Sequence, residues 1–101
     1  MTAYLIVRAE VDPSVRERFD VWYETEHLPD AMKAFGTLSA KRGWSEVSDN
    51  VHVALYEFSS LAHAKEIMAS DALKGMIAEF DRHWAGKVDR TREFFEVAQT
   101  L

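Results

Sequence analysis

His27 is the side chain in this sequence that is best suited to moving a proton. An imidazole titrates near neutral pH, so it can exchange a proton with a phenol, an enol or a lactone. Pro29 disfavours helical geometry at Leu28, which predicts that the helix carrying His27 ends close to it. The negative end of the helix dipole would then favour the protonated ring. A purely structural role is the alternative, because a histidine at a helix end can also bond an unpaired carbonyl.

Glu26 is the second candidate for acid–base chemistry. On an α-helical wheel it falls in the same stripe as Phe19 and Trp22, which is the face that should be buried. A carboxyl group that is buried without a cation has a raised pKa and can act as a general acid or base. If the last turn unwinds before Pro29, the carboxylate instead reaches water or pairs with an arginine such as Arg8.

Aromatic residues accompany these two candidates. Tyr23 lies four residues before His27 and could hydrogen-bond its ring or pack at an interface. Trp22, Phe80 and Trp84 recur at helical spacings, a pattern that is typical of a core and that also suits the wall of a pocket. We therefore expect these rings to shape a small apolar pocket next to His27.

Tyr56 and His52 share one face of a predicted strand. They line the pocket if that face is turned toward the helices, and they belong to an interface between copies if it is not. His83 lies at the edge of an apolar helical stripe, where it could line the pocket. No two histidines have the spacing of a metal site and cysteine is absent, so we expect no metal ion and no other cofactor.

The elements that must position these residues follow the order β-α-β-β-α-β. Helical periods between Asp12 and Gly36 and between Ser60 and Gly86 predict two helical layers, each broken in two. The predicted strands are Ala3–Ala9, Leu38–Trp44, Val51–Phe58 and Thr91–Ala98. This is the order of an α+β domain of the ferredoxin-like type, with helices on one face of a four-stranded antiparallel sheet. It occupies residues 1–101 as a single domain.

The predicted strands carry apolar residues on both faces. Val53 and Leu55 lie on one side of their strand, while Tyr56 lies on the other. Helices that cover one face leave the second face bare, so we expect two copies to pack sheet to sheet. Closed two-fold dimers are the commonest oligomers, and the sequence therefore predicts a homodimer.

Composition and charge narrow the other partners. The 101 residues have a formal net charge of −5 and scattered Lys and Arg residues, which argues against binding to nucleic acid. No apolar run is long enough for a signal peptide or a membrane span. We expect a cytoplasmic protein that does not insert into membranes.

The segment Trp22–Pro29 has the pattern W-x-x-x-x-H-x-P and follows a predicted strand. It resembles the end of the first helix in the EthD-like branch of the dimeric α/β-barrel superfamily. The resemblance implies a ferredoxin-like protomer, a barrel made by two sheets, and a small apolar pocket at the position of His27. The superfamily includes cofactor-free monooxygenases, isomerases, cyclases and haem-degrading enzymes, so the resemblance specifies the fold better than the chemistry.

Together, the residues and the resemblance imply a small cofactor-independent enzyme of the isomerase, cyclase or monooxygenase type. Its substrate would be a compact apolar molecule, aromatic or polyketide-like. His27 would act as the acid or base, with Tyr23, Glu26 or Tyr56 assisting. A non-catalytic small-molecule-binding or stress-type barrel is one alternative, and a haem-binding or haem-degrading protein that uses His83 is the other.

Overall fold

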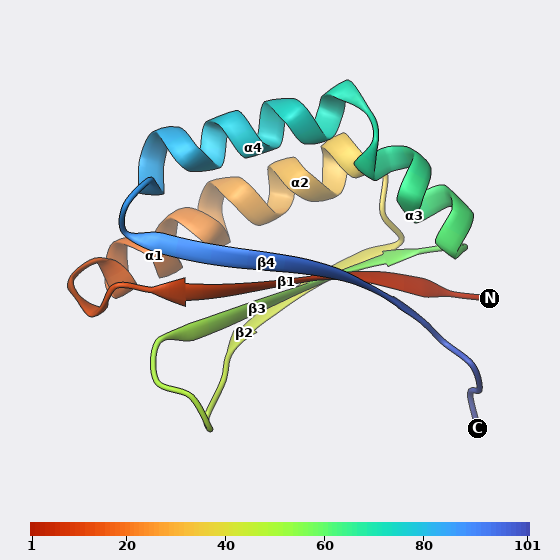
Figure 1. Ribbon diagram of the computed structural model, residues 1–101, viewed down its shortest axis with the longest axis horizontal. Coiled ribbons are helices and arrows are strands. Elements are labelled where there is room, and N and C mark those ends of the chain that lie inside the picture. Colours follow the sequence, from red (N-terminus) through yellow and green to blue (C-terminus); the bar gives the residue numbers. More distant parts are fainter.

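One antiparallel sheet forms one layer of the molecule, and the helices form the other (Figure 1). The computed structural model describes residues 1–101. The strands are β1 (Ala3–Val11), β2 (Ser39–Trp44), β3 (Val51–Phe58) and β4 (Val88–Glu96). They lie in the order β2-β3-β1-β4, with antiparallel pairing throughout. This is the α+β ferredoxin-like arrangement, so the predicted fold class is confirmed.

The helical layer consists of two broken runs. The first passes from a 3-10 turn (Pro13–Val15) through α1 (Arg16–Trp22) and a π turn (Tyr23–His27) into α2 (Leu28–Phe35). The second contains α3 (Leu61–Met68) and α4 (Asp71–Trp84). α4 is the longest helix, with 14 residues, and no helix has both the length and the apolarity that a membrane crossing requires.

Two predicted helix boundaries are confirmed by their capping contacts. The Ser60 hydroxyl oxygen accepts a hydrogen bond of 3.1 Å from the backbone N–H of His63, which starts α3. Gly36 closes α2 in the left-handed conformation, with φ of 63°, where a side chain would be strained. α2 therefore stops in time for the chain to turn back into β2.

The first helical run does not end near His27 as the sequence predicted. It continues through the π turn, in which the N–H of Leu28 bonds the carbonyl of Tyr23, five residues back. Pro29 has no N–H, and its ring would clash with the carbonyl of Thr25 in a regular α-helix. The wider turn accommodates the proline without breaking the helix. The Thr25 hydroxyl also donates to the carbonyl of Val21 at 2.8 Å, a contact that often bends helices.

The last strand begins three residues earlier than predicted. β4 starts at Val88, which pairs with Val11 at the far end of β1. Charged residues in this part of β4 concealed the strand from a search for apolar runs. The consequence is that Arg90 belongs to the sheet rather than to a loop.

The core lies between the helices and the sheet and is dominated by aromatic rings. Phe19 is fully buried at its centre. Six rings have centroids between 5.1 and 6.3 Å from that of Phe19, and they belong to Trp22, Tyr23, Trp44, His52, Phe80 and Trp84. Contacts of this kind are worth about 0.5–1.5 kcal/mol each beyond the area they bury.

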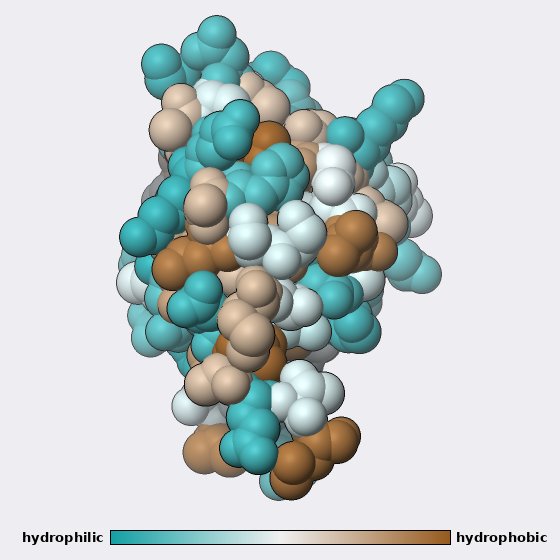
Figure 2. All heavy atoms as spheres, turned by 90° about the vertical axis from the view of Figure 1, so that its right-hand side faces the viewer, coloured by the Kyte–Doolittle hydropathy of each residue, from teal (hydrophilic) through white to brown (hydrophobic).

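No helix covers the second face of the sheet (Figure 1). The register places six apolar side chains on this open face, namely Tyr4, Ile6, Val51, Val53, Leu55 and Phe95. Phe95 is 53% exposed. Viewed from the end that carries both termini, the upper part of the molecule is mostly hydrophilic, and apolar patches lie at mid-height and at the lower edge (Figure 2). The prediction that apolar side chains lie on both faces of the sheet is therefore confirmed.

Candidate functional site

A small, partly open cavity of about 30 Å³ lies between the sheet and the helices. Its apolar wall consists of Leu5, Val7, Phe35, Leu73, Met76, Ile77 and Phe80. Its polar lining consists of Tyr23, His27, Tyr56, Arg90 and Arg92. A space of this size holds about one water molecule, so a larger ligand has to displace parts of the wall. The convergence of five hydrogen-bonding side chains on one apolar hollow makes it the candidate site.

The π turn brings His27 into this cavity. Its ring stacks on the indole of Trp22, with centroids 4.6 Å apart and planes inclined by 20°. The two residues are five positions apart, which is one π turn. The same shift turns Glu26 outward, so this residue is exposed and does not line the cavity. The helical-wheel expectation of a buried Glu26 is therefore wrong, because the wheel assumes an uninterrupted α-helix.

His27 is a neutral, buried imidazole. The residue is 8% exposed, and its Nδ1 atom is buried without a hydrogen-bond partner. Burial, and to a smaller extent the positive charge of Arg90, lowers the pKa of His27 to about 4. The expected protonated ring at a helix end is therefore wrong, since the helix continues past His27. The ring makes no capping hydrogen bond to a carbonyl.

Tyr23 and Tyr56 form a buried pair of hydroxyl groups. Their oxygen atoms are 2.9 Å apart, so one hydroxyl donates to the other. The accepting hydroxyl keeps its own proton for a third group. Burial raises the pKa of Tyr23 to about 12 and the pKa of Tyr56 well above its usual value, which keeps both hydroxyls protonated. Tyr23 meets His27 edge to face, with centroids 4.8 Å apart, rather than through the hydrogen bond considered from the sequence.

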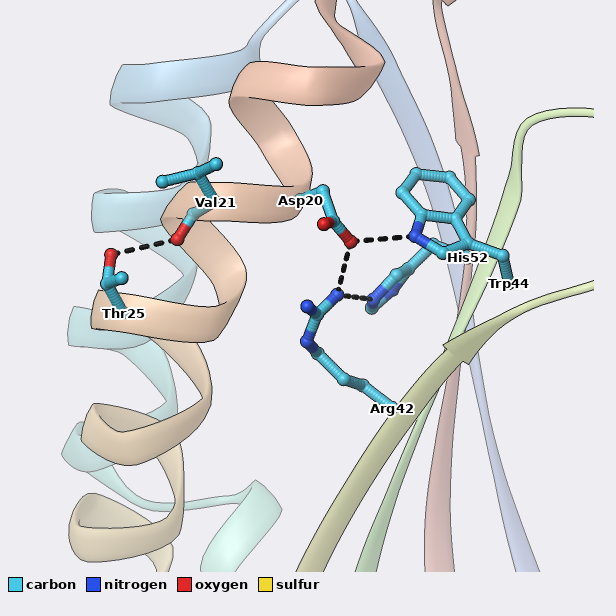
Figure 3. Close-up of polar contacts among 6 residues, drawn as sticks. All are labelled: Asp20, Val21, Thr25, Arg42, Trp44 and His52. Carbon is cyan, nitrogen blue, oxygen red and sulfur yellow. Dashed lines mark hydrogen bonds and ion pairs between the residues drawn. The ribbon is translucent and has the colours of Figure 1, made fainter.

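His52 faces the helices together with Tyr56, but it lies behind the site rather than in it. Figure 3 shows Arg42 between His52 and Asp20, at 3.3 Å from His52 Nε2 and 2.8 Å from Asp20 Oδ1. A guanidinium can only donate, so Nε2 accepts and the ring is neutral. Burial first and then the charge of Arg42 lower the pKa of His52 to about 4. The centroid of its ring lies 4.4 Å from that of the Tyr23 ring, against which it packs.

The Asp20 carboxylate on α1 accepts hydrogen bonds from two residues of β2, of which Arg42 is one. It also accepts a hydrogen bond of 2.8 Å from Trp44 Nε1, as Figure 3 shows. The hydrogen bonds from Arg42 and Trp44 hold the pKa of Asp20 below its usual value. Helix α1 is thereby fixed to the sheet next to the site.

The other aromatic candidates divide between the cavity and the core. Phe80 lines the cavity, whereas Trp22 and Trp84 are buried in the core and do not. His83 is exposed on α4, with its Nδ1 atom 2.9 Å from the carbonyl oxygen of Glu79. The geometry thus separates His83 from the cavity and gives the haem interpretation no support. No group of three or more His, Asp or Glu side chains is arranged to hold a metal ion.

The sequence analysis missed Arg90 and Arg92. Arg90 and Arg92 lie on the helix-facing side of β4, on the same face as Phe94, which pairs with Leu5. The guanidinium of Arg90 lies 3.7 Å from the centroid of the Phe80 ring. Their spacing of two residues was the available signal, because it places both side chains on the face that Phe94 occupies.

Solved structures with the same fold span the whole chain. An EthD family protein from Bacillus halodurans has a TM-score of 0.74 and 18% identity, over 96% of this chain and 99% of that protein. SnoaB, a cofactor-independent oxygenase from Streptomyces nogalater, has a TM-score of 0.72 and 13% identity, over 99% of this chain and 96% of that one. An antibiotic biosynthesis monooxygenase has a TM-score of 0.67 and 12% identity, over 96% and 99%.

The chain shares its ferredoxin-like fold with these three proteins. The resemblance that the segment Trp22–Pro29 indicated is thereby confirmed for the fold, and one of the similar structures is an EthD family protein. No protein-family model and no curated protein sequence matches the chain. At these identities the α/β-barrel neighbours establish the architecture, and the chemistry of the cavity has to be argued from its own side chains.

Proposed function

We propose that this α/β-barrel protein is a small cofactor-independent enzyme that acts on a compact aromatic or polyketide-like molecule by acid–base chemistry. The observation that carries the proposal is the pair of hydroxyls of Tyr23 and Tyr56, 2.9 Å apart, in a cavity that His27 also lines. These groups can accept and donate protons within an apolar wall. SnoaB, which has the same fold, is a cofactor-independent oxygenase.

The first chemical step is removal of a proton from a phenol, an enol or a carbon next to a carbonyl. Neutral His27 is the base, because burial keeps its ring unprotonated at neutral pH. The free proton of the tyrosine pair hydrogen-bonds the oxygen on which negative charge develops. Isomerisation, cyclisation and addition of dioxygen can each start from the resulting phenolate or enolate. The substrate's own structure then decides which reaction follows.

Substrate binding requires the cavity to widen. A neighbouring hollow of about 130 Å³ shares the side chains of Leu5, Leu73 and Arg92 with the first cavity. Leu73 is only half-buried, so a change in its rotamer joins the two spaces at little cost in packing. A single aromatic ring would then extend from the tyrosine pair toward the start of α4.

We also propose that the protein is a cytoplasmic homodimer that packs through the open face of the sheet. The apolar side chains on that face would be buried, as stable dimers require. Lys41 lies on this face at the β2 edge, and Glu93 lies on it at the β4 edge. A two-fold arrangement that places β2 opposite β4 of the partner brings these opposite charges together.

The low pKa of His27 favours one second function, a non-catalytic binder of the same molecules. A base with a pKa of about 4 has little driving force for proton removal at neutral pH. In a binder, the tyrosine pair and His27 would recognise the ligand without changing it. The two functions differ in whether the bound molecule is consumed.

A screen for turnover tests the proposal. Hydroxylated aromatic and polyketide-like compounds are incubated with the protein, and their loss is followed by liquid chromatography with mass spectrometry and by an oxygen electrode. We expect at least one compound to be converted, and Tyr56→Phe to slow the conversion at least about tenfold. Compounds that bind without conversion would instead support the binder. Conversion that is unchanged in both His27→Gln and Tyr56→Phe would place the activity elsewhere.

A further inference from the structure

The cavity is cationic although the chain is acidic. The whole sequence has a formal net charge of −5. The cavity lining nevertheless includes the guanidinium groups of Arg90 and Arg92 and no carboxylate. Arg92 is exposed to solvent, and the ion pair of Arg90 is with Asp81, which does not line the cavity, so no residue of the wall neutralises either charge.

Arg90 is held in place while its charge remains largely available. Its side chain is 11% exposed, and its guanidinium lies against the ring of Phe80. The nearest carboxylate oxygen is Asp81 Oδ1, at 3.4 Å, on a side chain that is 61% exposed. A contact of this length with a solvated carboxylate neutralises little of the charge. Stacking on Phe80 fixes the direction of the guanidinium, which prepares it to receive a ligand.

Arg92 stands where the two hollows meet. Its side chain lines both the cavity next to His27 and the neighbouring one, and it makes no ion pair. Glu93 also borders the outer hollow, but the register places its side chain on the open side of the sheet, opposite Ile6. The charges of both arginines act on the site, since each of them lowers the pKa values of Tyr23, Tyr56 and His27.

We propose that the site selects an aromatic anion, with Arg92 and Arg90 binding a negatively charged oxygen on the ring and the apolar wall receiving the ring itself. This inference rests on the proposed small-molecule site and adds the charge of its ligand. A guanidinium forms paired, charge-assisted hydrogen bonds with a carboxylate and a single one with a phenolate. The apolar surroundings strengthen both. A neutral ring of the same shape gains none of this energy.

Binding of matched probes tests the inference. Benzoate is compared with benzamide, and dinitrophenolate with dinitrobenzene, by chemical-shift titration of the full-length protein. We expect each anion to bind at least about tenfold more tightly than its neutral counterpart. Preference for benzoate over dinitrophenolate, or the reverse, identifies the ligand as a carboxylate or a phenolate.

Arg92→Gln is the decisive variant, because its side chain is exposed enough for the fold to tolerate the change. We expect this variant to lower the ratio of anion affinity to neutral-probe affinity about tenfold. Arg90→Lys keeps the positive charge and should still weaken anion binding. Arg18→Gln is the matched control. It makes the same change in net charge at an exposed site on α1 that makes no ion pair, and it should leave binding unchanged.

The outcomes separate this inference from the proposed function. If neutral probes bind as tightly as anions, or if Arg92→Gln behaves like Arg18→Gln, the inference is overturned while the small-molecule site stands. If no probe binds at millimolar concentration, the inference is overturned for single-ring ligands, and the proposed function is then judged by the turnover screen alone.

Discussion

The imidazole of His27 lies flat on the indole of Trp22, at a centroid distance of 4.6 Å. The stack fixes the plane of the histidine ring, which also makes edge-to-face contacts with Tyr23 and Phe80. It exists because the π turn brings residues five positions apart onto one face of the helix. A helix of regular α geometry would place Glu26 there instead.

Separate substitutions of His27 and Glu26 test which of these two neighbouring side chains acts as the acid or base. We expect His27→Ala to lower kcat/KM for an identified substrate at least about hundredfold, which is the usual contribution of a general base. Glu26→Ala should change kcat/KM by less than about twofold, because its side chain is exposed to solvent. Steady-state kinetics measures both, with thermal melting as the check of folding. Equal losses in the two variants would contradict this placement of the residues.

The two neutral histidines predict a loss of stability in mild acid. The folded pKa values of His27 and His52 are about 4, against 6.5 for an unperturbed histidine. Below pH 6.5 the unfolded chain binds protons at these rings and the folded chain does not. The free energy of unfolding should therefore fall as the pH drops from about 6.5 to about 4, by up to about 3 kcal/mol per histidine.

Urea denaturation across this pH range measures the effect, and His27→Gln should reduce the slope by about half. A free energy of unfolding that stays constant between pH 7 and pH 5 would show that the rings are solvated or paired with acids.

Removal of either tyrosine hydroxyl should destabilise the fold, and the two effects should not add. Tyr23→Phe leaves the hydroxyl of Tyr56 buried without its partner, and Tyr56→Phe does the converse. We expect each to cost about 1–3 kcal/mol. The double variant should cost less than the sum of the two, since no unpaired hydroxyl remains. Additive costs in a double-mutant cycle would mean that the hydroxyls act separately in solution.

Arg42 should control the titration of His52. Its positive charge, 3.3 Å from Nε2, is the second cause of the low pKa of that ring after burial. Arg42→Gln should therefore raise the pKa of His52, as measured by nuclear magnetic resonance of the imidazole protons. Lys41→Gln is the control, because the neighbouring residue points to the opposite face of the sheet. An identical shift in both variants would indicate a general charge effect.

The open face of the sheet should determine the oligomeric state. Leu55 lies on this face near its centre, so Leu55→Lys would place a charge in the proposed dimer interface. We expect sedimentation velocity to show a dimer for the unmodified chain and a monomer for this variant. Val21→Lys, at an exposed position on α1, should remain dimeric. A monomeric unmodified chain at micromolar concentration would remove the homodimer from the proposal.

The sequence predicted the sheet well where one physical rule decided the outcome. Val51–Phe58 is a run of mostly apolar residues that follows a turn signal, and its predicted boundaries are confirmed. Alternation also fixed the shared face of His52 and Tyr56, although only the structure showed that this face is turned to the helices. The predicted start of β4 was three residues too far along the chain, because Asp89 and Arg90 are typical of loops. Only their pairing with β1 shows that they belong to the strand.

The site was harder to predict because its contacts join distant parts of the chain. Tyr23 and Tyr56 are 33 residues apart, and no local pattern announces their hydrogen bond. The π turn was missed because a helical wheel assumes about 100° per residue throughout. One extra residue in a turn was enough to exchange the positions of Glu26 and His27.

The aromatic side chains around Phe19 also give the protein an intrinsic fluorescence that should be sensitive to the cavity. All three tryptophans of the sequence belong to that group, so every indole emits from within 6.3 Å of the centroid of the Phe19 ring. Trp22 additionally contacts the imidazole of His27, and a protonated imidazole quenches indole emission. The intrinsic fluorescence of the unlabelled protein should thus report events at the cavity directly, without a dye or a reporter mutation.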